Sequence, residues 1–172
     1  MSCATLEEII HGCERNTGGL FEFYAGDIED IDSITETEAD WEVTAMTVGV
    51  APVKVSIKRG TSNFTEDEAD DLVNGSSVNT LTVNLMLHRR SAEKSRALSI
   101  LSAGQRYLYG FLKDANGVWW YADHLQVTTK GEGSGQARAD GSKYSVVLVA
   151  EMEHLMYQVD PAVVASVIAT AS

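Results

Sequence analysis

Apolar and polar residues alternate from Thr80 to His88, and this period of two constrains the fold more than any other feature of the sequence. Leu or Val occupies every odd position, whereas Thr, Asn and His dominate the even positions. Successive side chains of a β-strand point to opposite faces of its sheet, so the pattern predicts a strand with one buried and one exposed face. Such half-buried strands are typical of antiparallel sheets.

A β-hairpin is expected from Arg106 to Val127. Its two strands, Arg106 to Lys113 and Val118 to Val127, are joined by a turn whose Asn116-Gly117 pair accommodates a positive φ angle. The aromatic side chains of this hairpin could form a ligand groove, but cross-strand aromatic pairs more often stabilise a sheet, so we expect them in the core. They are Tyr107, Tyr109, Phe111, Trp119, Trp120 and Tyr121.

Several other segments match strands. Val53 to Lys58 alternates with a period of two, and Trp41 to Val48 is its expected hairpin partner. Leu20 to Tyr24 is predicted to be a short aromatic strand. Lys143 to Glu153 is apolar on both faces, which predicts a central strand. Lys130 to Gly135 is rich in glycine, and we expect it to form a flexible loop.

Two segments before the hairpin match helices. Ser91 is a suitable N-cap for a helix that runs through Ala103, and Gly104 then occupies the position at which helices commonly end. Ala4 to His11 has apolar residues at helical spacing and predicts a short N-terminal helix. The sequence therefore places one full helix between predicted strands.

A third helix is predicted near the C-terminus, from Ala162 to Ala169, where Asp160-Pro161 forms its first turn. This helix is apolar on nearly all sides, and on a monomer it would expose more hydrophobic surface than is usual. We therefore expect it to dock on a neighbouring copy. The predicted interface residues are Val163, Val164, Val167 and Ile168.

These elements predict one mainly β domain over the 172 residues. The expected architecture is an antiparallel β-sandwich or partly closed barrel with one flanking α-helix, a short N-terminal helix and an apolar C-terminal helical tail. The longest apolar runs are far shorter than the ~20 residues of a transmembrane helix, so no membrane span is expected.

The chain carries a net charge of -12, and most of the excess lies in residues 22–71, which hold 14 acidic and three basic side chains. This balance argues against tight nucleic-acid binding, because binding DNA requires Lys and Arg to displace phosphate counterions. Asp27 to Asp40 is predicted to be an edge strand or exposed loop, and Asn63 to Ser77 a protruding loop or hairpin tip. The candidate acidic residues are Asp27, Glu29, Asp30, Asp32, Glu66, Asp67, Glu68, Asp70 and Asp71.

The sequence offers no arrangement typical of catalysis or of cofactor binding. The four histidines lie in four different predicted elements and have no second ligand at metal-binding spacing. Gly131 to Gly135 lacks the Gly-Lys-Ser/Thr of a phosphate loop, and Asp27 to Asp32 lacks the turn glycine of a calcium loop. Cys3 and Cys13 have no CxxC spacing. We therefore predict no catalytic residues, no metal and no cofactor.

Several short strings occur in a characteristic order along the chain: Cys13 with Gly18–Leu20, Tyr24–Ile31, Asp114–Trp120, Gly133–Tyr144 and Tyr157–Val164. Together they resemble small structural proteins encoded by tailed bacteriophages and prophages of Bacteroidetes-type hosts, most closely the tail tube (major tail) protein family. The segment Thr61 to Gly75 departs from the resemblance, because it is longer and more acidic here than is common in that group.

The resemblance implies a virion protein, made in the host cytoplasm, whose copies form hexameric rings that stack into a tube for DNA. A wall rich in carboxylates would let DNA pass transiently without adhering. The partners implied are other copies of the chain and other virion proteins. Two alternatives stay open: a capsid decoration or head-tail joining protein, and a carbohydrate-binding β-module that uses the aromatic hairpin.

Overall fold

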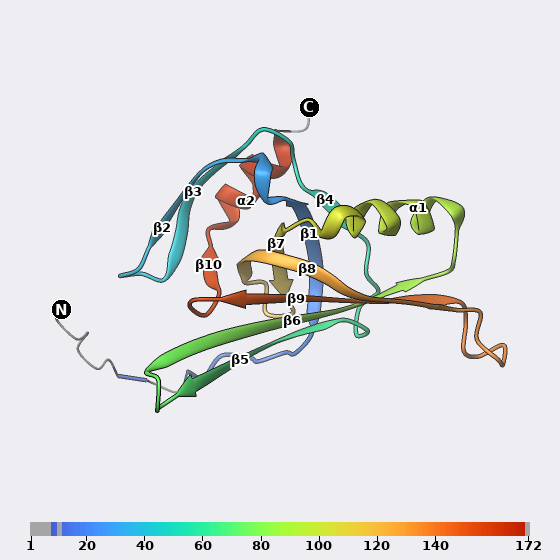
Figure 1. Cartoon of the computed structure of the whole chain (residues 1–172), viewed down its shortest axis with the longest axis horizontal. Coiled ribbons are helices and arrows are strands. Elements are labelled where there is room, and N and C mark those ends of the chain that lie inside the picture. The colour runs from blue at the N-terminus through green and yellow to red at the C-terminus, as the bar shows by residue number, and fades with distance from the viewer. Residues whose placement is uncertain (1–7, 10–11, 171–172) are drawn as a thin grey trace.

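The computed structural model describes residues 8–9 and 12–170, and 51% of the chain is in β-strands. The sheet curls into a half-barrel with two helices packed on it (Figure 1). This confirms the predicted mainly β fold with a flanking helix. The strands are β1 (Leu20–Asp27), β2 (Ile31–Thr37), β3 (Glu42–Val48), β4 (Val53–Val55), β5 (Asn63–Asp71), β6 (Ser76–His88), β7 (Leu108–Asp114), β8 (Trp119–Gly133), β9 (Lys143–Met152) and β10 (Tyr157–Val159).

Helices and short 3-10 turns connect these strands. The two α-helices are α1 (Ala92–Leu101) and α2 (Pro161–Ala169), and the 3-10 turns are η1 (Ile28–Asp30) and η2 (Ala103–Gln105). The predicted helix after Ser91 is confirmed, because the Ser91 side chain accepts a hydrogen bond from the Lys94 amide, and Gly104 has a φ of 68°. The predicted N-terminal helix from Ala4 to His11 lies outside the described residues, apart from Glu8 and Ile9.

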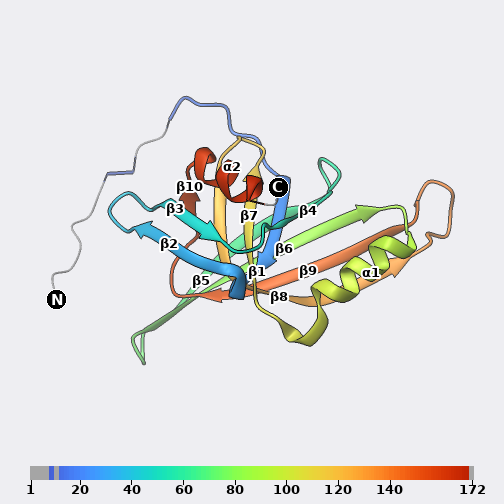
Figure 2. The ribbon, with the colours of Figure 1, turned by 90° about the horizontal axis from the view of Figure 1, so that it is seen from above.

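Strand β8 joins the two wings of the sheet. Its first half pairs with β7 and β10, as in Trp120 opposite Leu112, and its second half pairs with β9, as in Gln126 opposite Val149. The first wing has the order β2-β3-β10-β8-β7-β1-β4, and the second wing continues from β8 through β9 and β6 to β5. The pairs are antiparallel except β3 with β10. Figure 2 shows the two wings from above.

The period of two in β6 is confirmed. Leu81 and Val83 are fully buried, while the alternate side chains are more exposed. Strand β9 lies between β6 and β8, as predicted for a central strand. The β7–β8 hairpin is also confirmed, with a φ of 91° at Gly117. Tyr109 and Phe111 are fully buried, so the aromatic run is mainly core, although Tyr107 is about half exposed.

Helix α2 packs on its own chain, which corrects the expectation that its apolar side chains need a neighbouring copy to cover them. Val163, Val164 and Val167 are buried in a core cluster with β3 residues, and Ile168 is partly buried against the same cluster. The physical reason is that the turn at Asp160, which accepts a hydrogen bond from the Ala162 amide (2.8 Å), folds the apolar helix back over the first wing.

One pairing prediction and one loop prediction are also corrected. Trp41 to Val48 does not pair with Val53 to Lys58. Instead β3 pairs with β2 and β10, and the three-residue β4 pairs with β1. Pro52 has no amide hydrogen, which disfavours a continuous hairpin ladder at this point. Lys130 to Gly133 is not a loop but the end of β8. For Asn63 to Ser77 the hairpin alternative is confirmed, because β5 pairs with β6 around a turn at residues 72–75.

Replacing a buried valine of α2 should make the domain less stable. Val164→Ala is expected to lower the free energy of unfolding by about 2 kcal/mol, because it removes two buried methyl groups and leaves a cavity. Urea denaturation followed by circular dichroism would measure the change. Val50→Ala is the control, since Val50 is 59% exposed. Equal effects of the two substitutions would contradict the assignment of α2 to the core.

Candidate functional site

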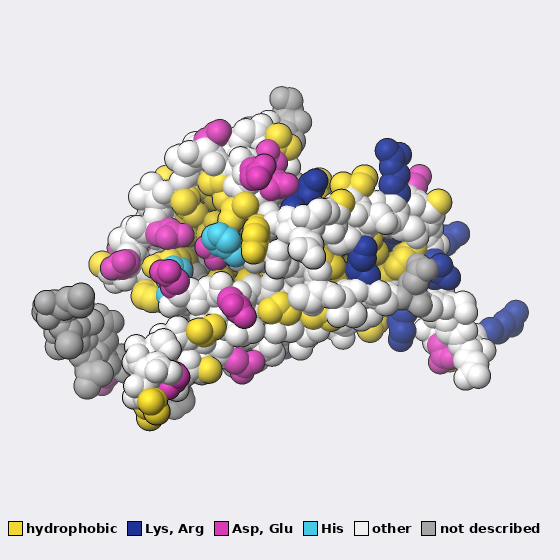
Figure 3. Space-filling view, in the orientation of Figure 1, with side chains coloured by type: hydrophobic (Ala, Val, Ile, Leu, Met, Phe, Trp, Pro, Cys, Tyr) yellow, Lys and Arg dark blue, Asp and Glu magenta, His cyan; other side chains and the backbone are white. Residues whose placement is uncertain are grey.

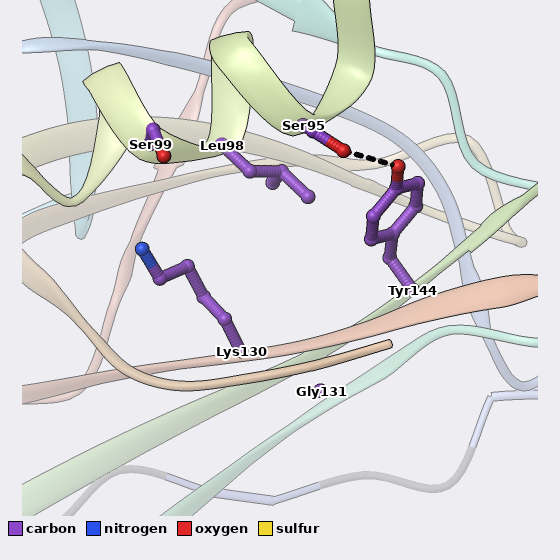
Figure 4. A pocket seen from close by; sticks show the side chains of 6 residues that line it. All are labelled: Ser95, Leu98, Ser99, Lys130, Gly131 and Tyr144. Atoms are coloured by element: carbon purple, nitrogen blue, oxygen red, sulfur yellow. Dashed lines mark hydrogen bonds between the residues drawn. The ribbon is translucent and has the colours of Figure 1, made fainter. Parts of the chain in front are cut away.

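A hollow of about 280 Å³ lies between α1 and the second wing, and Figure 4 shows its lining residues. Leu98 points into it from the helix, and Lys130 and Tyr144 border it from the sheet. The Tyr144 hydroxyl donates to the Ser91 carbonyl (3.1 Å) and lies 2.7 Å from the Ser95 Oγ. The Lys130 ammonium donates to the Ser102 hydroxyl. These polar groups hold the helix on the sheet.

Two core tyrosines have raised pKa values. Burial, with a smaller contribution from the charge of Asp30, raises the pKa of Tyr109 to about 12. Burial also raises the pKa of Tyr121, and Asp123 adds to the effect. Both hydroxyls therefore stay neutral at physiological pH and cannot serve as bases there.

The predicted acidic residues fall into two groups on different wings. Asp27, Glu29, Asp30 and Asp32 surround η1 on the first wing, whereas Glu66 to Asp71 lie on β5, at the outer edge of the second wing. The structure therefore does not bring them together as one surface. Within residues 8–9 and 12–170, no group of three or more His, Cys, Asp or Glu side chains is arranged to hold a metal ion.

Asp27 has a structural role in the first group. Its carboxylate accepts a hydrogen bond from the Glu29 amide (3.2 Å) and so caps η1. It also forms an ion pair with Arg106, with 3.2 Å between the charged atoms. These contacts fix the chain between β1 and the edge strand β2. The prediction of an edge strand between Asp27 and Asp40 is confirmed, because β3 is the one described strand that pairs with β2.

Glu66 connects β5 to the chain between β9 and β10. Its Oε1 accepts a hydrogen bond from the amide of the buried Met156 (2.7 Å) and a longer one from Asn79 Nδ2 (3.4 Å). Asn79 is itself buried and donates to the His154 carbonyl (2.9 Å). Of the β5 acids, Glu66 is therefore a structural residue, while Asp67, Glu68, Asp70 and Asp71 are exposed.

On the N-terminal side of Asn79 the second wing consists of two strands, β5 and β6. Strand β6 pairs with β9 only from Asn79 onward, so residues 69–78 form a two-stranded hairpin that we call the acidic arm. At its turn the Asp71 carboxylate accepts hydrogen bonds from the side chain and amide of Asn74 and from the Val73 amide, and these bonds lower the pKa of Asp71. The predicted hairpin tip is thus an ordered turn, in which only residues 72–75 lack strand structure.

The tip of the acidic arm is apolar and almost fully exposed. The side chains of Leu72 and Val73 are 93% and 92% accessible. A two-stranded hairpin without a third strand is marginally stable by itself, and exposed apolar groups at its tip add to this cost. The arm is therefore a candidate contact surface. The sequence signal for it was the pair Leu72-Val73 between the acids and Asn74-Gly75.

Three aromatic rings attach the β2–β3 turn to the chain between β9 and β10. The Trp41 ring lies 4.9 Å from that of Tyr157, which lies 4.5 Å from that of His154, measured between ring centroids. Trp41 Nε1 donates to the Met156 carbonyl (3.2 Å). Nearby, burial raises the pKa of Glu36. Glu66 and Trp41 thus both hold the backbone of Met156, which ties both wings together at this end.

Three strands each have one edge that is not paired with another described strand. In the described part of the chain β2, β4 and β5 each pair with one other strand. An open edge presents unpaired backbone N–H and C=O groups and can accept a strand from another chain. Strand β5 is nine residues long and is the longest of the three.

Comparison with known proteins adds no identity. Neither a protein-family model, nor a curated protein, nor a solved structure matches the chain. None of the helices in the described ranges has the length and apolar character needed to cross a membrane.

The role of Glu66 can be tested by stability. Glu66→Ala should lower the free energy of unfolding by about 1–3 kcal/mol, because it leaves the buried Met156 amide without its acceptor. Glu66→Gln keeps a carbonyl oxygen and should be milder. Glu68→Ala, on the same strand but exposed, should change stability by less than about 0.5 kcal/mol. Chemical denaturation of the three variants measures this order, and a result in which Glu68→Ala is the most destabilising would contradict it.

Proposed function

We propose that this chain is a self-assembling structural subunit, of the kind that builds the tail tube of a bacteriophage. In this proposal copies of the chain form rings, hexameric as in the family that the sequence resembles, and the rings stack into a tube within the virion. The chain then works through contacts with its own copies and with other virion proteins, and it performs no catalysis.

The acidic arm is the observation that carries the proposal. Leu72 and Val73 extend from a hairpin beside which the described residues place no third strand, so those residues leave this element only partly stabilised. A neighbouring copy that covers the tip would bury both side chains, and burial of each contributes roughly 1.5–3 kcal/mol. A repeated contact of this kind favours assembly over a free monomer.

The open strand edges and the curled sheet also support assembly. Edges at β2, β4 and β5 can each accept a strand from an adjacent copy, and closing edges between copies removes the exposed backbone groups. A half-barrel presents a curved surface, which suits a subunit of a ring. The net charge of -12 would keep passing DNA from adhering to such an assembly.

The carbohydrate-binding alternative loses its main support. Tyr109, Phe111 and Tyr121 are buried in the core and cannot form a flat sugar platform. The capsid decoration or head-tail joining alternative predicts a trimer or monomer that binds capsids, and the assembly experiment below separates it from a tube subunit.

Substitution at the arm tip should weaken self-assembly without unfolding the domain. Leu72→Ser with Val73→Ser is expected to shift the assembly threshold to a protein concentration at least about tenfold higher, because the tip loses its apolar contact. Sedimentation velocity and negative-stain microscopy over a concentration series would measure it. Rings or tubes of the unaltered chain are the expected result.

The matched control is Val50→Ser, which removes an exposed apolar side chain outside the arm. This variant should assemble like the unaltered chain. A chain that stays monomeric or trimeric at all concentrations would contradict the tail tube proposal, and a double variant that assembles normally would contradict the role of the arm.

A further inference from the structure

The two ends of the second wing carry opposite charge. Strands β6 and β9 run antiparallel along this wing from Asn79 opposite Met152 to His88 opposite Lys143. The 13 residues of β6 span roughly 40 Å at about 3.3 Å per residue. Figure 3 shows Asp and Glu side chains gathered at the end with the acidic arm and Lys and Arg side chains gathered at the end with α1.

The basic end is built where β6, α1 and the β8–β9 connection meet. Arg89 and Arg90 both donate backbone hydrogen bonds to Ser142, and the Lys94 ammonium donates to the carbonyls of His88 (2.6 Å) and Arg89 (3.1 Å). Lys143 pairs with His88 in the β6–β9 ladder. Segments 88–104 and 129–143 hold seven of the 13 Lys and Arg residues and three acids. The basic residues are Arg89, Arg90, Lys94, Arg96, Lys130, Arg138 and Lys143.

The acidic end has no compensating cation in the segments that form it. Residues 36–42, 66–71 and 151–153 contribute 11 acidic side chains and no Lys or Arg. Asp67 and Glu68 lie on β5 directly before the acidic arm, Asp70 and Asp71 lie on the arm, and all four are exposed. Two copies placed with the same end together would repel each other, whereas opposite ends attract.

The hollow under α1 opens on the half of the wing that carries the cations. Leu98 provides an apolar wall, and Lys130 stands at its border (Figure 4). The Ser95 and Tyr144 hydroxyls in the hollow already hydrogen-bond within the chain, so an apolar side chain can enter without leaving these two unsatisfied. An arm tip with two apolar residues flanked by carboxylates matches this surface in both apolar character and charge.

We propose that copies of this chain join head to tail, with the acidic arm of one copy seated on the basic end of the next. Leu72 and Val73 enter the hollow beside Leu98, while Glu68, Asp70 and Asp71 face Lys130, Lys143 and Arg89 of the neighbour. This inference rests on the proposed self-assembly and names the surfaces that perform it. The occupant of the basic end is thus a second copy of the same chain.

Two charge-reversed variants test the pairing. One carries Arg89→Glu and Lys143→Glu at the basic end. The other carries Asp70→Lys on the acidic arm and Glu68→Lys directly before it. All four side chains are exposed, so both variants should fold. Each variant alone should assemble more than about tenfold less readily than the unaltered chain, because like charges then meet at every contact.

An equimolar mixture of the two variants should recover assembly, since the reversed arm of one then fits the reversed end of the other. Sedimentation velocity at low salt and at 1 M NaCl, a concentration at which screening is strong, would measure all three samples. If the unaltered chain and each variant alone assemble equally well, the head-to-tail contact is wrong, although self-assembly itself still stands. Unaltered chains that never assemble would refute the proposed function itself.

A polyanion is the competing occupant of the basic end, and a short duplex DNA serves as the probe. We expect fluorescence anisotropy at low salt to show no binding of this DNA to the chain that depends on Arg89 and Lys143. Tight binding by the unaltered chain that the Arg89→Glu, Lys143→Glu variant loses would overturn the proposal, because the basic end would then be a nucleic-acid surface.

Discussion

The structure depends on the divided pairing of β8. This 15-residue strand contributes its first half to one wing and its second half to the other, with register shifts against β7 and against β9 where the pairing changes. Such irregularities bend a strand and increase its twist. Because of this bend, the first wing can pack against α2 while the second wing extends away from it as a long ladder. Both the half-barrel and the separation of the charged ends therefore follow from one strand.

The second wing extends because its strands are long and pair without interruption. Strands β6 and β9 keep one register over ten residue pairs, and β5 adds nine pairs on the outer side. A ladder of this length is stiff enough to hold groups at its two ends far apart. The aromatic contacts around Trp41 and the hydrogen bonds of Glu66 then fix the acidic end to the first wing. The charges at the ends consequently lie on a rigid frame.

Local patterns predicted the elements of this fold better than their partners. The alternation in β6, the Asn116-Gly117 turn and the Ser91 cap each arise from interactions within a few residues, and all three are confirmed. The pairing of β3 with β2 and β10 depends on contacts between distant segments, which no local pattern encodes. The glycines at the end of β8 suggested a loop, but backbone pairing with β9 makes them a strand.

The functional surfaces were also harder to predict from the sequence than the local elements. The apolar sequence of α2 indicated a need for burial, which is correct, but hydrophobicity does not specify whether the covering surface belongs to the same chain or to another. The acidic residues show a second form of this limit, because Asp27 and Glu66 are held by internal hydrogen bonds while their neighbours are exposed. Only the geometry separates a structural carboxylate from a surface one. The exposed tip residues Leu72 and Val73 were visible in the sequence, but their meaning depends on the two-stranded arm that carries them.

The separation of charge also restricts the symmetry of any assembly. A two-fold contact places identical surfaces together, so it would bring acidic arm against acidic arm or basic end against basic end. A head-to-tail contact avoids this repulsion, and such contacts generate closed rings when the rotation between copies closes and open filaments when it does not. A chain with opposite charges at the ends of one stiff ladder is therefore suited to rings and tubes and poorly suited to a symmetric dimer. The carboxylates along the open edge of β5 have a related effect. They discourage this edge from pairing with strands of other chains that do not present a cationic surface.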